Sequence, residues 1–130
     1  MSERSAEIER RTGETSVSLR LGLDGSGAGT RATGVGFLDH MLDLLARHGG
    51  LDLEASVQGD LQTGSHHTVE DTGIVLGQAL DRALGERRGI ARYGSATIPM
   101  DEARAGVPIA RAEGFTAHAE SMEIRQNPRP

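Results

Sequence analysis

Two adjacent histidines, His66 and His67, stand near the middle of the chain, in the segment GSHHTVED, residues 64–71. If a helix begins near His66, Glu70 is a neighbour of both histidines, because residues three and four apart lie side by side on a helix. Side chains one position apart point about 100° away from each other, so the two rings face different directions. The pair therefore suits two metal ions better than one.

A second group of candidate ligands lies upstream, in the segment GFLDHMLDLLARHGG, residues 36–50. His40 and His48 are eight residues apart and share nearly the same helical face, with Asp39 and Asp43 close to them. The chain has no cysteine, so every ligand of such a site has to be a histidine or a carboxylate. Nitrogen and oxygen ligands without sulfur suit Mn, Fe, Co, Ni or Zn.

The same residues also have ordinary structural interpretations. The segment TVED is equally typical of a helix start, where Glu and Asp are favoured in the first turn. His48 could be a residue of the last helical turn, whose charge suits the helix dipole. His118 lies in an irregular tail and fits a surface position better than a functional one.

Composition narrows the class of protein. A length of 130 residues suits one compact domain, and the net charge is -5 with only three aromatic residues. Neither a basic stripe nor aromatic platforms are visible, which argues against nucleic-acid binding. The charged N-terminus lacks an apolar signal region, and no stretch approaches the roughly 18 apolar residues of a membrane span. We expect a cytoplasmic protein that does not contact a membrane.

Hydrophobic periodicity predicts the elements that position these side chains. Residues 15–23 alternate between apolar and polar, which indicates a half-buried strand, with residues 4–11 and about 29–34 as antiparallel partners. Residues 36–50 have the period of a helix, residues 51–57 alternate again, and residues 66–89 predict a second helix. On the first helix, one face carries Phe37, Met41, Leu44, Leu45 and His48. The order of elements predicts an α+β fold, with helices on one face of a mostly antiparallel sheet.

The end of the chain differs from the rest. Past about Arg104 the sequence shows no sustained period, and it ends in QNPRP. We expect a half domain over residues 1–103 and a tail over residues 104–130 that is poorly ordered or held by a partner.

Several blocks of the sequence, taken together, identify a family. They run in order from about Ile8 to Ala103: RRTGETSVSLRLGLDGSG, TGVGFLDHML, ARHGG, GDL, HHTVEDTGIVLGQALDRALGERRGIARYG and PMDEA. In this order they resemble the first half of the imidazoleglycerol-phosphate dehydratases, lyases of histidine biosynthesis. The resemblance implies dehydration of imidazole glycerol phosphate to imidazole acetol phosphate with two manganese ions. It also implies a fold of two similar halves, each a four-stranded sheet with two helices on one side, in a homo-oligomer with sites between subunits.

The resemblance also assigns roles to individual residues. It implies that His40, His67 and Glu70 share one metal ion, whereas His66 binds the other. Metals on both ring nitrogens of the small phosphorylated imidazole substrate would act as Lewis acids and as a template.

Three further residues receive roles from the resemblance. It implies that Glu14 contacts the substrate and moves protons, that His48 lies at the edge of the site, and that Arg92 is a phosphate ligand. A guanidinium fork fits phosphate well. Without the resemblance, ordinary surface charges would be the better interpretation of Glu14 and Arg92.

The chain departs from the family pattern because the second HHxxE motif and the C-terminal signature are missing. One half supplies at best half of each metal shell. The chain could be a fragment that is inactive alone, a half that pairs with a second copy of itself, or a non-catalytic metal-binding or assembly subunit. A di-metal hydrolase is a further alternative, supported by the ligands alone.

Overall fold

A computed structural model of the chain describes residues 4–100, 103–110, 118–119 and 123–126, with side chains up to residue 99. The structure divides into two compact units, residues 1–86 and 87–130. All candidate ligands between positions 40 and 70 lie in the first unit.

The first unit is built on a four-stranded sheet in the order β1-β2-β4-β3. Its strands are β1 (Ser5–Arg11), β2 (Thr15–Gly22), β4 (Asp52–Gly59) and β3 (Arg31–Ala32). β2 lies antiparallel to both β1 and β4, which confirms the prediction of a mostly antiparallel sheet. The predicted place of the third segment was wrong. β3 pairs in parallel with β4 and does not touch β2, because β4 already occupies the second edge of β2.

Alternation along the strands separates a core face from a solvent face. Ile8, Leu19 and Ala55 lie opposite one another in adjacent strands and are all buried. On the other face, the guanidinium of Arg20 pairs with Glu7 at 3.5 Å and with Glu54 at 3.8 Å. One face of the sheet is therefore apolar and has to be covered.

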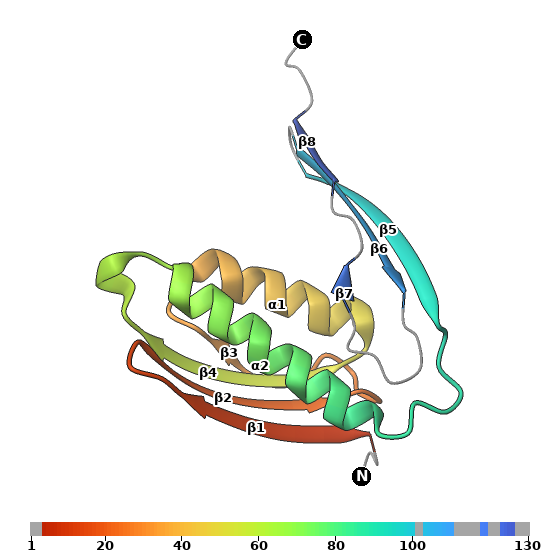
Figure 1. Cartoon of the computed structure of the whole chain (residues 1–130), viewed down its shortest axis with the longest axis horizontal. Helices are drawn as coiled ribbons and strands as arrows, with labels where there is room; N and C mark the ends of the chain where they lie inside the picture. The colour runs from red at the N-terminus through yellow and green to blue at the C-terminus, as the bar shows by residue number, and fades with distance from the viewer. Residues whose placement is uncertain (1–3, 101–102, 111–117, 120–122, 127–130) are drawn as a thin grey trace. The chain divides into compact units, whose positions relative to one another are not determined.

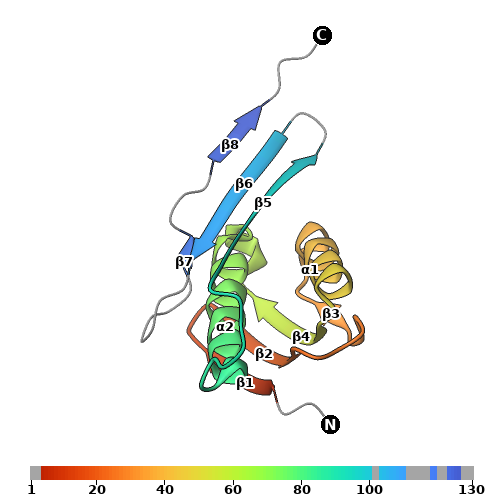
Figure 2. The ribbon, with the colours of Figure 1, turned by 90° about the vertical axis from the view of Figure 1, so that its right-hand side faces the viewer.

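Two helices provide that cover. Both α1 (Gly36–Gly49) and α2 (His66–Leu84) lie on the same face of the sheet, as Figures 1 and 2 show, and both begin at the same end of the unit. The α+β class with two helices on one face is confirmed. Among the described residues, no helix is long and apolar enough to cross a membrane.

The buried face of α1 is not the one that the sequence pattern singled out. Leu42 and Ala46 are the buried residues of this helix, whereas Phe37 is 66% exposed and Leu45 is 44% exposed. Leucines occupy both sides of the helix, so periodicity alone could not identify the side that faces the sheet. An apolar strip on the outer side of α1 is left uncovered by the described residues.

The second helix ends earlier than predicted. α2 ends at Leu84 rather than at Gly89, and Gly85 follows with a positive φ of 54°. The amide of Gly85 donates to the carbonyl of Arg82 at 3.2 Å, which closes the last turn. Glycine adopts such a positive φ more readily than other residues, because it lacks the Cβ that makes it costly.

The second unit contains a separate sheet. β5 (Tyr93–Met100) pairs antiparallel with β6 (Ala103–Ala110), and β6 also pairs antiparallel with β7 (His118–Ala119) and β8 (Glu123–Gln126). Part of the predicted poorly ordered tail therefore forms strands. The rest of that prediction concerns residues 111–117, 120–122 and 127–130, which lie outside the described residues.

Gly59 allows α2 to approach the end of β4. A Cβ built at this position would lie 2.1 Å from the Thr68 hydroxyl oxygen, inside a buried part of the unit. We predict that Gly59→Ala lowers the free energy of unfolding by about 1–3 kcal/mol, as overpacking does. Urea denaturation measures the change. Gly13→Ala is the matched control, because nothing lies within 4 Å of that Cβ, and it should change stability by less than about 0.5 kcal/mol.

Candidate metal centre

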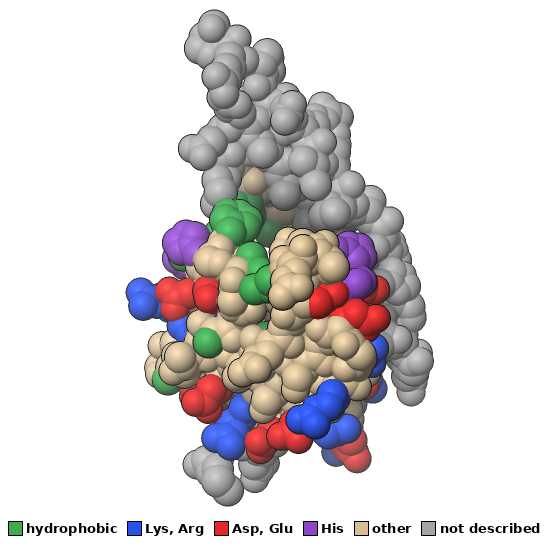
Figure 3. Space-filling model, turned by 90° about the vertical axis from the view of Figure 1, so that its left-hand side faces the viewer, with side chains coloured by type: hydrophobic (Ala, Val, Ile, Leu, Met, Phe, Trp, Pro, Cys, Tyr) green, Lys and Arg blue, Asp and Glu red, His purple; other side chains and the backbone are tan. Residues whose placement is uncertain are grey.

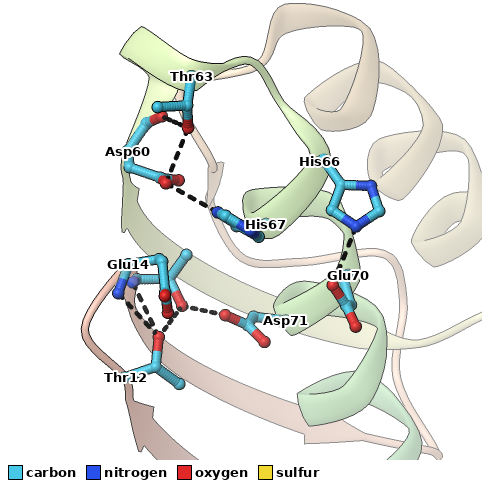
Figure 4. Close-up of polar contacts among 9 residues, drawn as sticks. Thr12, Glu14, Asp60, Thr63, His66, His67, Glu70 and Asp71 are labelled. Carbon is cyan, nitrogen blue, oxygen red and sulfur yellow. Dashed lines mark hydrogen bonds and ion pairs between the residues drawn. The ribbon is translucent and has the colours of Figure 1, made fainter.

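The two adjacent histidines open α2, as the sequence predicted, and they diverge. Their ring centroids are 5.5 Å apart and the ring planes meet at 71°. Glu70 lies beside His66, with 3.3 Å between the imidazole Nε2 and a carboxylate oxygen. Helix spacing allowed Glu70 to contact either histidine, and in the structure it contacts His66 (Figure 4).

His67 has a different carboxylate partner. Its Nδ1 lies 2.8 Å from the Oδ2 atom of Asp60, which follows directly after β4. The hydrogen bond to Asp60 raises the pKa of His67, and the charges of Asp60, Glu14 and Glu70 act in the same direction. A carboxylate on one ring nitrogen fixes the tautomer and leaves the other nitrogen to act as a ligand.

Asp60 is a site residue that the sequence analysis missed. The bond to His67 and a second one from the Thr63 hydroxyl, at 2.9 Å, lower the pKa of Asp60. Thr63 lies in η1 (Leu61–Thr63), a short 3-10 helix that joins β4 to α2. Asp60 lies outside α2, so no helix spacing relates it to His67. Its only signal in the sequence was the block GDL, which carried the resemblance.

Glu14 lies in the turn between β1 and β2, below His67 in Figure 4. Its side chain is exposed, and its charge is one of those that raise the pKa of His67. The structure therefore places the predicted substrate contact near the start of α2, although 53 positions separate Glu14 from His67 in sequence. Sequence spacing alone gives no hint of this proximity.

His40 is exposed on α1, in a different hollow of the surface. Its neighbours around that hollow are Gly29, Thr30, Arg31, Asp39 and Asp43, whereas His66 and Glu70 line a second hollow with Gly64, Ser65 and Val69. Figure 3 likewise shows histidine side chains at two separate places on the end of the unit where both helices begin.

The two aspartates next to His40 have structural partners. Asp39 accepts hydrogen bonds from the amide of Thr33 at 2.8 Å and from its hydroxyl at 2.6 Å. Asp43 pairs with the nearly buried guanidinium of Arg31, which lowers the pKa of Asp43. These bonds fix α1 to the segment before it, so neither carboxylate is a free metal ligand.

Two predicted residues remain, His48 and Arg92. His48 is exposed in the last turn of α1, two turns and about 12 Å along the helix from His40. Arg92 is exposed in the second unit, and its role as a phosphate ligand stays a prediction. Among the residues that the structure describes, no three His, Asp or Glu side chains converge as a metal site.

The donor types nevertheless fit a metal such as Mn²⁺. Imidazole nitrogens and carboxylate oxygens are available, and Asp60 orients His67 as ligating histidines are oriented in metalloproteins. Candidate donors therefore lie on both helices, His40 on α1 and His66, His67 and Glu70 on α2.

Comparison with known proteins decides the family. The model of the family described as imidazoleglycerol-phosphate dehydratase matches residues 33–123, more than half of the chain. The chain belongs to the imidazoleglycerol-phosphate dehydratase family. The match extends 20 residues beyond Ala103, where the recognisable blocks end.

Relatives that carry this name are close in sequence. The protein of Rhodopirellula baltica is 59% identical over 101 residues, which cover 78% of this chain and 50% of the relative. The protein of Thioalkalivibrio sulfidiphilus is 57% identical over 127 residues, or 96% of this chain and 64% of the relative. The chain thus spans about half the length of the first of these relatives and less than two thirds of the second.

Solved structures of the dehydratase share the fold. The enzyme of Staphylococcus aureus has a TM-score of 0.66 and 37% identity, with 82% of this chain and 57% of that chain covered. The enzyme of Pyrococcus furiosus, solved in complex with (S)-C348, has a TM-score of 0.64 and 33% identity. The comparison covers 79% of this chain and 53% of that one.

The Asp60–His67 pair makes stability depend on pH. Because the pKa of His67 is raised, its contribution is complete below about pH 6.5 and is lost as pH rises through the raised value. Because the pKa of Asp60 is lowered, its contribution is complete above about pH 4 and is lost as pH falls through the lowered value. The pair therefore stabilises the fold most between about pH 4 and pH 6.5.

We predict that Asp60→Asn returns the pKa of His67 toward 6.5, as followed by NMR titration of the ring. The loss of stability in this variant should be larger at pH 5 than at pH 8 in urea denaturation. Glu54→Gln is the matched control, since it removes an exposed carboxylate from the opposite face of the sheet. An unchanged His67 pKa in Asp60→Asn would contradict the pairing.

Proposed function

We propose that this chain supplies one half of a metal-dependent dehydratase that converts imidazole glycerol phosphate to imidazole acetol phosphate. The observation that carries the proposal is the family match over residues 33–123. The His66 and His67 pair at the start of α2 is consistent with it. The proposed place of action is the cytoplasm, which suits a small phosphorylated substrate.

The reaction defines what the residues have to do. Substrate and product differ by one water. The hydroxyl on the carbon attached to the ring leaves, a proton leaves the next carbon, and the resulting enol becomes a ketone. A carboxylate within reach of the side chain of the substrate can take that proton, and we assign this role to Glu14. Arg92 is proposed to hold the phosphate and His48 to lie at the edge of the site.

Two Mn²⁺ ions are the proposed cofactors. His40, His67 and Glu70 are assigned to one ion and His66 to the other, as the family resemblance implies. When bound to the two ring nitrogens of the substrate, the ions would supply Lewis-acid stabilisation of charge on the ring. The contact between Glu70 and His66 has to open if the two residues serve different ions, and their exposure leaves room for that movement.

A second copy of the chain is the proposed partner. The uncovered outer sides of the helices carry apolar residues, with Phe37 and Leu45 on α1 and Val69 and Ile74 on α2. The incomplete ligand groups lie on the same outer sides, because His40 and His66 are exposed there. Contact between two such surfaces would bury apolar area and bring further ligands to each partial set.

The alternatives predict different assemblies. An isolated fragment should expose the apolar strip and either stay metal-free or aggregate, whereas an assembly subunit would form an oligomer without turnover. A di-metal hydrolase would release phosphate from phosphate esters in the presence of Mn²⁺.

The first experiment measures mass and metal content together. We expect the purified chain, after addition of Mn²⁺, to form a defined oligomer with a fixed ratio of Mn to chain by light scattering and elemental analysis. His67→Ala should bind Mn²⁺ at least about tenfold more weakly, whereas His118→Ala, a histidine without a proposed role, should bind it normally.

The outcomes separate the candidates. Formation of imidazole acetol phosphate by the oligomer, lost in His67→Ala, supports the dehydratase. Phosphate release that His67→Ala abolishes would favour the hydrolase. A metal-free monomer or an aggregate would contradict self-pairing and leave this chain as an inactive half.

The apolar strip gives a separate prediction. Phe37→Glu places a charge at a 66% exposed position, so the fold of one chain should keep its stability within about 0.5 kcal/mol. The oligomer should dissociate, because burying an unpaired carboxylate in an interface is costly. Light scattering reports the mass, and Gln58→Glu on the polar face of the sheet is the control that should keep the oligomer. An oligomer that survives Phe37→Glu would exclude this strip as the interface.

A further inference from the structure

A chain of polar side chains joins the turn between β1 and β2 to α2, although the two segments are far apart in sequence (Figure 4). Thr15, the first residue of β2, is 4% exposed, and Asp71 of α2 is 7% exposed. The Thr15 hydroxyl donates a hydrogen bond to the Oδ2 atom of Asp71. Asp71 directly follows Glu70, so this bond ties the turn to the helix beside a proposed ligand.

The chain of bonds continues from Thr15 to the backbone of Glu14. The Thr12 hydroxyl oxygen lies 3.2 Å from the Thr15 hydroxyl oxygen. It accepts the amide N–H of Glu14 at 3.2 Å and that of Thr15 at 3.0 Å. Thr15 has one hydroxyl proton and gives it to Asp71, so Thr12 has to donate its own proton to Thr15. The bonds therefore run in one direction, from the Glu14 amide to the Asp71 carboxylate.

The link is specific, because two buried threonines of α2 make no such bond within the described residues. The hydroxyls of Thr68 and Thr72 are buried without a hydrogen-bond partner, so burial alone does not create such a bond here. The Asp71 carboxylate also lies 3.6 Å from the Nε atom of Arg10. This opposite charge compensates the burial of the carboxylate.

This chain of hydrogen bonds fixes the backbone from which the Glu14 side chain extends. Its backbone amide is fixed by Thr12, while its side chain remains exposed and near enough to His67 for its charge to act on that ring. We propose that Thr12, Thr15 and Asp71 form a positioning device, which holds the Glu14 turn against the first turns of α2. This inference rests on the proposed function, in which Glu14 takes the substrate proton.

Hydrogen exchange of the metal-free chain tests the link directly. Thr15→Val keeps the volume but removes the hydroxyl that bonds to Asp71. We expect the amide of Glu14 to exchange about tenfold faster, because the turn opens more easily once that hydrogen bond is lost. Thr12→Val should have the same effect without changing a buried residue. Thr15→Ser and Thr12→Ser keep the hydroxyl and should restore slow exchange.

The matched control is Thr72→Val, which removes a buried hydroxyl that has no partner and should leave the Glu14 amide unchanged. The amide of Leu19, in the middle of β2, reports on the whole sheet. Unchanged exchange at Glu14 in both valine variants would overturn the proposal. An equal increase at Glu14 and Leu19 would also overturn it, because that result reports general destabilisation.

Turnover is measured separately, so that the two proposals can fail independently. Exchange at Glu14 needs neither metal nor substrate, and a chain without dehydratase activity would contradict the proposed function while leaving the link intact. In an active oligomer, Thr15→Val should lower kcat with KM nearly unchanged, and Thr15→Ser should recover it. Equal kcat in Thr15→Val and the unmodified chain would contradict the positioning role.

Discussion

The first unit depends on the burial of one apolar face of its sheet. β2 supplies Val17, Leu19 and Leu21 to that face, and its neighbours β1 and β4 extend the same rows. Because the opposite face is charged, both helices have to pack on the same side. This constraint decides which side of α2 turns inward. His66, Val69 and Glu70 are left facing outward at its start.

Polar contacts hold the first turns of both helices to neighbouring segments of the chain. Asp39 holds the start of α1 to Thr33, and Asp71 holds the second turn of α2 to the β1–β2 turn. Asp60 does the same for His67 from the end of β4. Each contact uses an aspartate carboxylate, but of the three only Asp39 stood out beside the candidate ligands in the sequence. Carboxylates near the histidines are therefore of two kinds, those that hold the fold and those that remain exposed.

The sequence predicted the parts of the structure that follow from local pattern. Alternation located β2 and β4, β1 was expected as the antiparallel partner of β2, and the histidine pair located the start of α2. The parallel pairing of β3 was missed, because a two-residue strand has no period of its own. The end of α2 was missed since Glu86 and the arginines after it are good helix formers, which hid the stop at Gly85. Asp60 and Asp71 were missed because their partners are set by tertiary packing.

In the proposed assembly, metal binding and association are coupled by where the candidate ligands lie. His40 and His66 occupy separate hollows on the outer sides of two helices, and the exposed Phe37 and Val69 lie on the same outer sides. A second copy that buries these apolar groups would also cover the candidate ligands and would bring its own histidines and carboxylates to them. Metal that binds only the docked state stabilises that state by mass action. Apolar contact and metal coordination then favour the same assembly, and neither has to be strong alone.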